Sequence, residues 1–177
     1  MNRQQDLIAH TATATAPKSM PAISFFVSGT PRPQPRARSF VLRGKGGQPI
    51  LTKDGQPILR VNDPGTAEAW KQAVALAAKP FIPMVPLQGP LRVDIEFFFP
   101  RPKAHCRSNG ELKASAPYWH TGRGDVDNLW KSCADALTTI GMWDDDGQVC
   151  AGFIQKHYAE KPGAAISIYQ LRGDSLI

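Results

Sequence analysis

Apolar and charged residues alternate over residues 91–99, LRVDIEFFF. The odd-numbered positions are all apolar, whereas positions 92, 94 and 96 carry charges. A period of two along the chain is typical of a half-buried β-strand. The apolar residues 22–29 predict another strand, and residues 148–171 predict two more, joined by a turn at EKPG.

Two segments have the composition of helices. Residues 66–79, TAEAWKQAVALAAK, are rich in Ala, Lys, Gln and Leu, and they place Trp70, Val74 and Ala77 on one apolar face. Residues 127–140 predict a second helix. Gly141 is expected to end this helix, because glycine readily adopts the left-handed conformation that closes helices.

A short duplication lies in the first half of the chain. The sequence GQPIL at residues 47–51 returns at residues 55–59. A single repeat of this length is too short to indicate a repeat fold. With KDG between the two copies, it predicts a hairpin of two short strands around a glycine-containing turn.

The length of 177 residues suits a single domain that buries a core without disulfides or a structural metal. We expect residues 1–22 to be a disordered leader, because they contain few bulky side chains, and residues 23–173 to form the folded domain. The three cysteines are scattered and indicate neither a disulfide framework nor a zinc site. No apolar run is long enough for a membrane helix, so a cytoplasmic protein is expected.

Basic residues exceed acidic ones by six, and many of them occur in one stretch. Residues 31–60 contain a single acid, Asp54, and begin with alternate prolines that prevent a helix and keep the chain extended. Such an uneven basic segment attracts polyanions, although a solvated loop is the simpler interpretation of this segment alone. Its basic residues are Arg32, Arg36, Arg38, Arg43, Lys45, Lys53 and Arg60.

Six aspartates occur in residues 124–149, GDVDNLWKSCADALTTIGMWDDDGQV. Asp125 and Asp127 are two residues apart in a segment expected to be extended, so both carboxylates can point to one side. Asp127 would also suit the N-cap of the following helix. Asp135 shares a helical stripe with Asp127 and Lys131, and for Asp135 a solvated salt bridge is the simpler interpretation.

The other three aspartates, Asp144, Asp145 and Asp146, are adjacent. Like charges repel one another unless a cation or a basic partner neutralises them. The flanking Trp143 and Val149 indicate that this turn is held against the core. Because the cluster supplies carboxylates rather than His or Cys ligands, it favours a hard cation such as Mg²⁺ or Mn²⁺, with a solvated turn as the alternative.

Other chemistries receive no support from the sequence. If Asp146 and Gly147 were positions 5 and 6 of a calcium EF-hand, positions 1 and 12 would be Met142 and Phe153, which cannot bind calcium. None of the four histidines accompanies a nucleophile motif. Neither a P-loop nor a GxGxxG motif is present, so no nucleotide cofactor is expected.

Three motifs follow one another in the acidic segment: D-x-D-N-L-x-K from Asp125 to Lys131, A-D-A-L at residues 134–137, and W-x-D-D-x-Q-V from Trp143 to Val149. Together they resemble the RusA family of Holliday-junction resolvases, which is common in phages and prophages. The prolines and arginines of PRPQPRAR resemble the basic loop of that family, and Lys156 matches a further basic position.

The resemblance implies an α+β or α/β fold, a single small domain in which a mixed β-sheet packs with two main helices. It implies that Asp125, Asp127 and Asp146 are catalytic carboxylates that bind Mg²⁺, for which Mn²⁺ would substitute. Lys131 would be an essential cation of the site. Asp145 matches a second acid of the family's pair and is a further candidate metal ligand.

The implied activity is hydrolysis of phosphodiester bonds that resolves Holliday junctions in DNA recombination and repair. The implied partners are branched DNA and a second copy of the chain in a homodimer. The setting would be the cytoplasm of a bacterial host, with a phage or prophage gene as the source. The residues expected to contact DNA are Arg32, Arg36, Arg38, Arg43 and Lys156.

Two alternatives stay open. One is a phage nuclease that uses the same metal site on forks, flaps or other branched DNA. The other is a non-catalytic DNA-binding accessory protein in which the acidic cluster is a solvated turn. The chain also departs from the family in its longer leader, the GQPIL duplication, the expanded loop before Gly124, and Asp144, and these departures leave the DNA contacts undefined.

Overall fold

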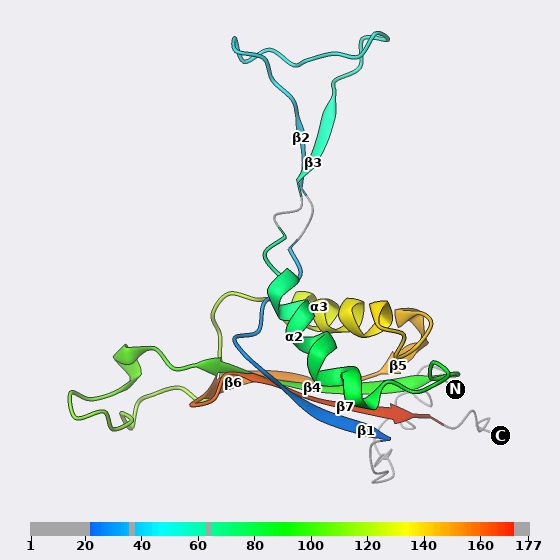
Figure 1. The fold of residues 1–177 in the computed structure, drawn as a ribbon. Helices are drawn as coiled ribbons and strands as arrows, with labels where there is room; N and C mark the ends of the chain where they lie inside the picture. Colours follow the sequence, from blue (N-terminus) through cyan, green and yellow to red (C-terminus); the bar gives the residue numbers. More distant parts are fainter. Residues whose placement is uncertain (1–21, 36–37, 63–64, 172–177) are drawn as a thin grey trace, which may run out of the picture.

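The structure is a computed structural model that describes residues 22–35, 38–62 and 65–171 (Figure 1). The predicted leader lies outside the described residues except for Ala22, and so do the last two residues of the predicted domain, 172 and 173.

A mixed sheet forms the base of the fold, with β4 at its centre. On one side β4 pairs antiparallel with β7, which in turn pairs antiparallel with β1. On the other side it pairs in parallel with both β5 and β6, which follow one another along the same edge. The strands are β1 (Ile23–Ser28), β4 (Leu91–Pro100), β5 (Val149–Ala151), β6 (Ile154–Ala159) and β7 (Gly163–Gln170).

Both main helices, α2 (Glu68–Ala78) and α3 (Val126–Thr139), cover the same face of the sheet (Figure 1). The row of β4 from Leu91 to Phe99 that the alternation predicts to be apolar is buried in the core. Trp70 and Val74 of α2 and Leu137 of α3 are buried in the same cluster. The predicted fold, a small domain with one mixed sheet and two main helices, is confirmed.

The ends of α3 follow from its sequence. The helix begins at Val126, one residue before the predicted start, and Asp125 rather than Asp127 occupies the N-cap position. At the other end the Gly141 N–H donates to the Thr138 carbonyl and the Met142 N–H to the Leu137 carbonyl. With Gly141 at a φ of 77°, this is a Schellman motif, as the glycine predicts.

The two predicted C-terminal strands are present and are joined by the expected turn. They lie on opposite edges of β4, which separates them. An additional short strand, β5, precedes β6. The break between them is at Gly152, where a Cβ would lie 2.5 Å from the Val93 carbonyl oxygen, so only glycine fits there without displacement.

Two projections leave this body (Figure 1). The first, which we call the arm, is residues 38–62, and its base is an antiparallel pair of strands, β2 (Arg38–Val41) and β3 (Leu59–Asn62). The predicted hairpin between the two GQPIL copies forms around its glycine-containing turn, where Leu51 and Pro57 make an antiparallel bridge and the Ile58 N–H donates to the Ile50 carbonyl. The two short strands predicted there are reduced to this bridge, and the regular strands of the arm are β2 and β3. The second projection is the loop of residues 101–117, which contains the short helix η2 (Lys103–His105).

Among the described residues, no helix is both long enough and apolar enough to cross a membrane.

The contact between α3 and the sheet predicts how much stability the fold loses when a buried side chain is shortened. Replacing the fully buried Leu137 by alanine should lower the free energy of unfolding by about 2–5 kcal/mol, because it leaves a cavity between helix and sheet. Leu76→Ala is the matched control, because Leu76 is exposed on α2, and it should change the free energy by no more than about 0.5 kcal/mol. Urea denaturation followed by circular dichroism measures both, and equal losses would contradict the assigned core.

Candidate active site

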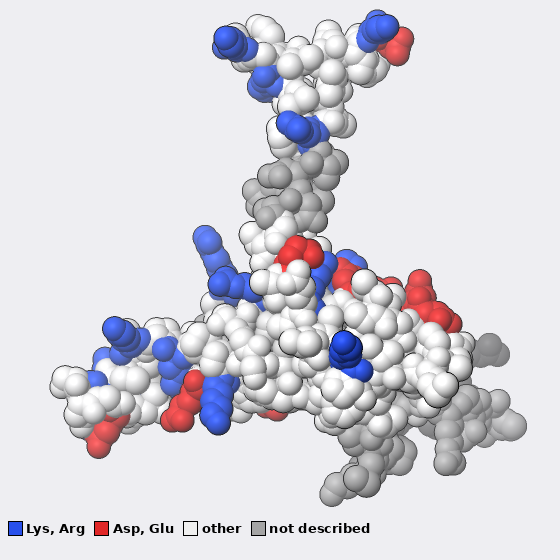
Figure 2. All heavy atoms as spheres, in the orientation of Figure 1, with Lys and Arg blue, Asp and Glu red and all other residues white. Residues whose placement is uncertain are grey.

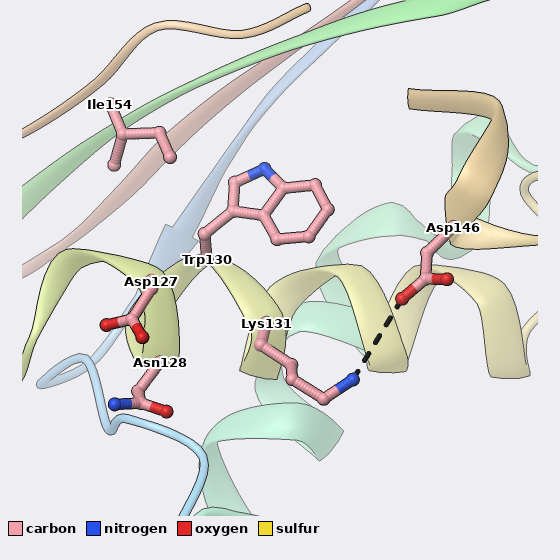
Figure 3. Close-up of a pocket in the computed structure, with 6 residues that line it drawn as sticks. All are labelled: Asp127, Asn128, Trp130, Lys131, Asp146 and Ile154. Carbon is pink, nitrogen blue, oxygen red and sulfur yellow. Dashed lines mark ion pairs between the residues drawn. The ribbon is translucent and has the colours of Figure 1, made fainter. Parts of the chain in front are cut away.

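An open cavity of about 420 Å³ lies between the first turns of α3 and the short helix η3 (Asp146–Gln148) (Figure 3). Four of its lining residues come from α3, and Asp146 comes from η3. Two of the predicted catalytic carboxylates and the predicted lysine therefore share one cavity. The lining residues are Asp127, Asn128, Trp130, Lys131, Asp146 and Ile154.

Helix α3 presents these side chains because its opposite face is buried. Leu129, Cys133 and Leu137 are buried against the core, so Asp127 and Lys131, on the other side of the helix, are exposed. Burial also raises the pKa of the Cys133 thiol to about 12, so this cysteine stays protonated and is not a nucleophile. The predicted stripe of Asp127, Lys131 and Asp135 runs along the outward face of the helix.

The loop before the arm is attached to α3. The Gln34 N–H donates to the Asn128 carbonyl at 2.8 Å, and the buried Ser132 hydroxyl donates to the Arg32 carbonyl at 2.9 Å. These bonds hold the backbone of Arg32 close to the cavity.

Of the other arginines predicted to contact DNA, the structure describes the side chain of Arg43. Arg43 lies in the arm, where its guanidinium donates to the Gly47 carbonyl. Arg36 lies outside the described residues, and for Arg38 only the backbone, in β2, is described.

The three adjacent aspartates have different roles in the turn. The Asp144 carboxylate accepts a hydrogen bond from the Gln88 amide at 2.8 Å. The Asp145 carboxylate accepts from the Gly147 N–H at 2.7 Å and forms a capping box with Gln148, so it caps η3. The turn is anchored by Trp143, which is buried as predicted and donates to Thr138. Asp146 is the one of the three that lines the cavity with Lys131.

A chain of ion pairs runs from η3 across α3 to α2. The Lys131 ammonium lies 3.9 Å from the Asp146 carboxylate and donates to Asp135 at 2.9 Å. The other Asp135 oxygen lies 3.6 Å from the Lys71 ammonium. The hydrogen bond to Asp135 is the main reason that the pKa of Lys131 is raised, and the charges of Asp135 and Asp146 add to it against some loss of solvation.

The position of Asp135 between two lysines was not predicted from the sequence. Its spacing of four residues from Lys131 indicated an ion pair, and a solvated salt bridge was the simpler interpretation. Its partly buried carboxylate is held between two lysines, and the second of them, Lys71, is on a different helix. Only the packing of α2 against α3 brings Lys71 to this position.

Lys156 has a local role in the loop that leads into α3. Its ammonium donates to the Gly124 carbonyl at 2.6 Å and to the Gly122 carbonyl at 3.1 Å. Both bonds fix the backbone immediately before Asp125. A contact of Lys156 with DNA stays a prediction.

The donors of the cavity suit a hard cation, because carboxylate and amide oxygens are the preferred ligands of Mg²⁺. Asp127 and Asp146 line it from two elements together with Asn128, while Asp125 is at the N-cap. In Figure 3 the Lys131 side chain lies between the two carboxylates. Within the described ranges, no three Asp, Glu, His or Cys side chains form a preassembled metal-binding group. The donor types fit the ion, and its binding stays a prediction.

Residues 29–169 match the endodeoxyribonuclease RusA family. The chain belongs to this family. The matched region begins at the end of β1 and extends through β7, so it includes the arm, both helices and all residues of the cavity. A relative in Bacillus subtilis (strain 168), the uncharacterized protein YqaN, is 29% identical over 154 residues, which are 86% of this chain and 99% of YqaN.

Membership of the RusA family confirms the resemblance carried by the three motifs. For an endodeoxyribonuclease, an open cavity with carboxylates and a preorganised ammonium is a suitable place for a phosphodiester of DNA. The open cavity leaves room for the nucleotides of the strand that continue on either side of such a group.

The ion-pair chain predicts the titration of Lys131. Asp135→Asn should lower the pKa of Lys131 towards its ordinary value, because it removes the largest cause of the raised pKa. Since a raised pKa stabilises the fold below that pKa, this contribution is present at neutral pH and is lost only as pH rises through the folded-state value. NMR titration of ¹³C-labelled lysine side chains measures the shift. Asp144→Asn, whose carboxylate bonds to Gln88 instead, is the control, and an unchanged Lys131 in Asp135→Asn would contradict the assignment.

Proposed function

We propose that this RusA-family protein is a Mg²⁺-dependent, structure-selective endodeoxyribonuclease that resolves Holliday junctions. The observation that carries the proposal is the cavity in which Asp127, Lys131 and Asp146 come together beside the loop of Arg32. Carboxylates alone would repel a phosphate. A divalent cation between them and the DNA removes this repulsion and explains why a basic protein has acids at its centre.

Asp127 and Asp146 would hold Mg²⁺, with Mn²⁺ as a substitute, and Asp125 would join them from the N-cap of α3. Such an ion supplies a water of lowered pKa and stabilises negative charge on a phosphoryl oxygen. Asp145 is the least suited of the proposed ligands, because its carboxylate already accepts the Gly147 N–H within η3.

Lys131 would stabilise the negative charge that develops on the scissile phosphate. An ammonium does this best when it is already oriented, because no reorganisation is then needed during the reaction. Asp135 supplies that orientation through a hydrogen bond of 2.9 Å, and Lys71 keeps Asp135 in place. We therefore assign Asp135 and Lys71 as positioning residues and Lys131 as a catalytic residue.

Branched DNA would be recognised mainly through its backbone. The Arg32 side chain is exposed, and its backbone is bonded to Ser132 of α3. Phosphate contacts by such residues position DNA without reading its sequence. A four-way junction also needs two symmetric cuts, which two identical sites in a homodimer would provide. Action in the bacterial cytoplasm, from a phage or prophage gene, completes the proposal.

Replacing either cavity carboxylate should nearly abolish cleavage of a synthetic four-way junction. Asp127→Asn and Asp146→Asn should each lower the single-turnover rate at least about a hundred-fold, since a bound metal contributes several kcal/mol and each 1.36 kcal/mol is a factor of ten. Junction binding should be retained or strengthened, because a negative charge is removed. Asp144→Asn, outside the cavity, should cleave at close to the unmodified rate, and wild-type rates in both cavity variants would overturn the proposal.

Removal of divalent cations should stop cleavage without preventing binding. With a chelator, gel-shift assays should still show the junction complex, and excess Mg²⁺ or Mn²⁺ should restore cleavage. Cleavage that continues in the chelator would contradict the metal dependence. Parallel reactions on linear, forked, flapped and four-way DNA identify the substrate, and faster cutting of forks or flaps would favour the branch nuclease over the resolvase.

A further inference from the structure

The duplicated sequence in the arm builds two equivalent turns. In the first turn the Gly44 N–H donates to the Gln48 carbonyl, and in the second the Thr52 N–H donates to the Gln56 carbonyl. Gly47 and Gly55 close the two turns with equivalent bonds and have φ values of 78° and 77°. The duplication thus repeats a structure as well as a sequence, with a spacing of eight residues.

A ring of three backbone hydrogen bonds joins the two turns. The Leu42 N–H donates to the Ile58 carbonyl, the Ile58 N–H to the Ile50 carbonyl, and the Ile50 N–H to the Leu42 carbonyl, at 2.8–2.9 Å. The three segments of chain therefore meet at one point above β2 and β3. From this point the two turns spread apart at the end of the arm (Figure 1).

The two turns carry matching positive charges. Lys45 and Lys53 occupy the same position in each turn, and both are exposed. Arg43 and Arg60 add two further positive charges, against Asp54 as the arm's acid. Figure 2 shows these basic side chains spread over the outer part of the arm. Among the described residues, neither lysine forms an ion pair within 4 Å, so both ammonium groups are available to an external anion.

The arm begins at the edge of the candidate active site. Just before it, Gln34 is bonded to Asn128, which lines the cavity. After β3 the chain continues into α2, which supplies Lys71. Five residues of β2 and the ring extend about 16 Å at about 3.3 Å per residue, which equals the rise of about five base pairs. The arm therefore follows directly on a segment bonded to the cavity and is as long as about five base pairs of duplex DNA.

We propose that the arm is a two-pronged clamp for duplex DNA, in which the turns of Lys45 and Lys53 contact the phosphate backbone away from the cleaved position. The proposal rests on the proposed function, because it takes branched DNA as the ligand of the cavity. Two equivalent turns with one lysine each suit a backbone that repeats the same charged group. The ring of hydrogen bonds orders the turns before binding, which lowers the entropic cost of contact.

The salt dependence of binding tests this proposal. Each lysine that contacts a phosphate contributes about 0.9 to the slope of log K against log salt concentration. Lys45→Ala/Lys53→Ala should reduce the magnitude of the slope by about 2, measured on a four-way junction in a chelator so that cleavage does not interfere. The control is Lys79→Ala/Lys161→Ala, which removes the same charge from two exposed sites outside the arm and should leave the slope almost unchanged.

Excision of the turns tests the contact directly. Because Leu42 and Ile58 are already hydrogen-bonded partners, residues 43–57 can be replaced by Asn-Gly, which favours a two-residue hairpin turn. Hydroxyl-radical footprinting of the wild type should show protected backbone on a duplex arm of the junction away from the cleaved bond. The excised protein should lose that protection and keep the protection at the cleaved bond.

The outcomes separate the two proposals. If the wild type does not bind the junction, the proposed function fails, and the clamp fails with it. If the wild type binds but the lysine variant and its control have equal slopes, or the footprint survives excision, only the clamp is overturned. Light scattering of the excised protein covers the remaining case: a change in oligomeric state would mean that the arm contacts a second copy of the chain and would also overturn the clamp.

Discussion

The packing of α3 against the buried face of β4 determines the geometry of the whole candidate site. Leu129, Cys133 and Leu137 fix the rotation of the helix about its own axis, and that rotation decides which residues face outward. A turn of the helix by one residue, about 100°, would carry Lys131 away from Asp146. The apolar core, which takes no part in the chemistry, is thus what places an ammonium beside a carboxylate.

A second constraint brings η3 to the helix. The side chain of Gln148 donates to the carbonyls of Leu87 and Gly89 and accepts from the backbone of Asp144 and Asp145. The acidic turn is therefore attached to the connector that leads into β4. Together with buried Trp143, this attachment holds Asp146 at the cavity although three like charges are adjacent in the sequence. The hydrogen bonds that the carboxylates of Asp144 and Asp145 accept help to stabilise their negative charges.

The sequence predicted what depends on periodicity and on local motifs. The alternation in β4, the two helices, the glycine that ends α3 and the outward stripe of Asp127 and Lys131 all follow from neighbouring residues, and the structure has them. The three motifs also identified the family, because their combination is far more specific than any one of them.

Contacts between distant segments could not be predicted from the sequence in this way. The attachment of Gln34 to Asn128, the pairing of Lys71 with Asp135 and the separation of β6 from β7 by β4 depend on tertiary packing. The GQPIL duplication predicted the turn between its two copies, which pair at Leu51 and Pro57, but not the longer pairing of β2 with β3 at the base of the arm.

The ring at the end of the arm also bears on how such a protein changes over generations. The hydrogen bonds of residues 42–58 described above all lie within the arm, and both of its ends enter the body next to α2 and α3. A change in the number of eight-residue units would therefore alter the arm and leave the core in place. The length of the arm is thus independent of the packing that places the residues of the cavity.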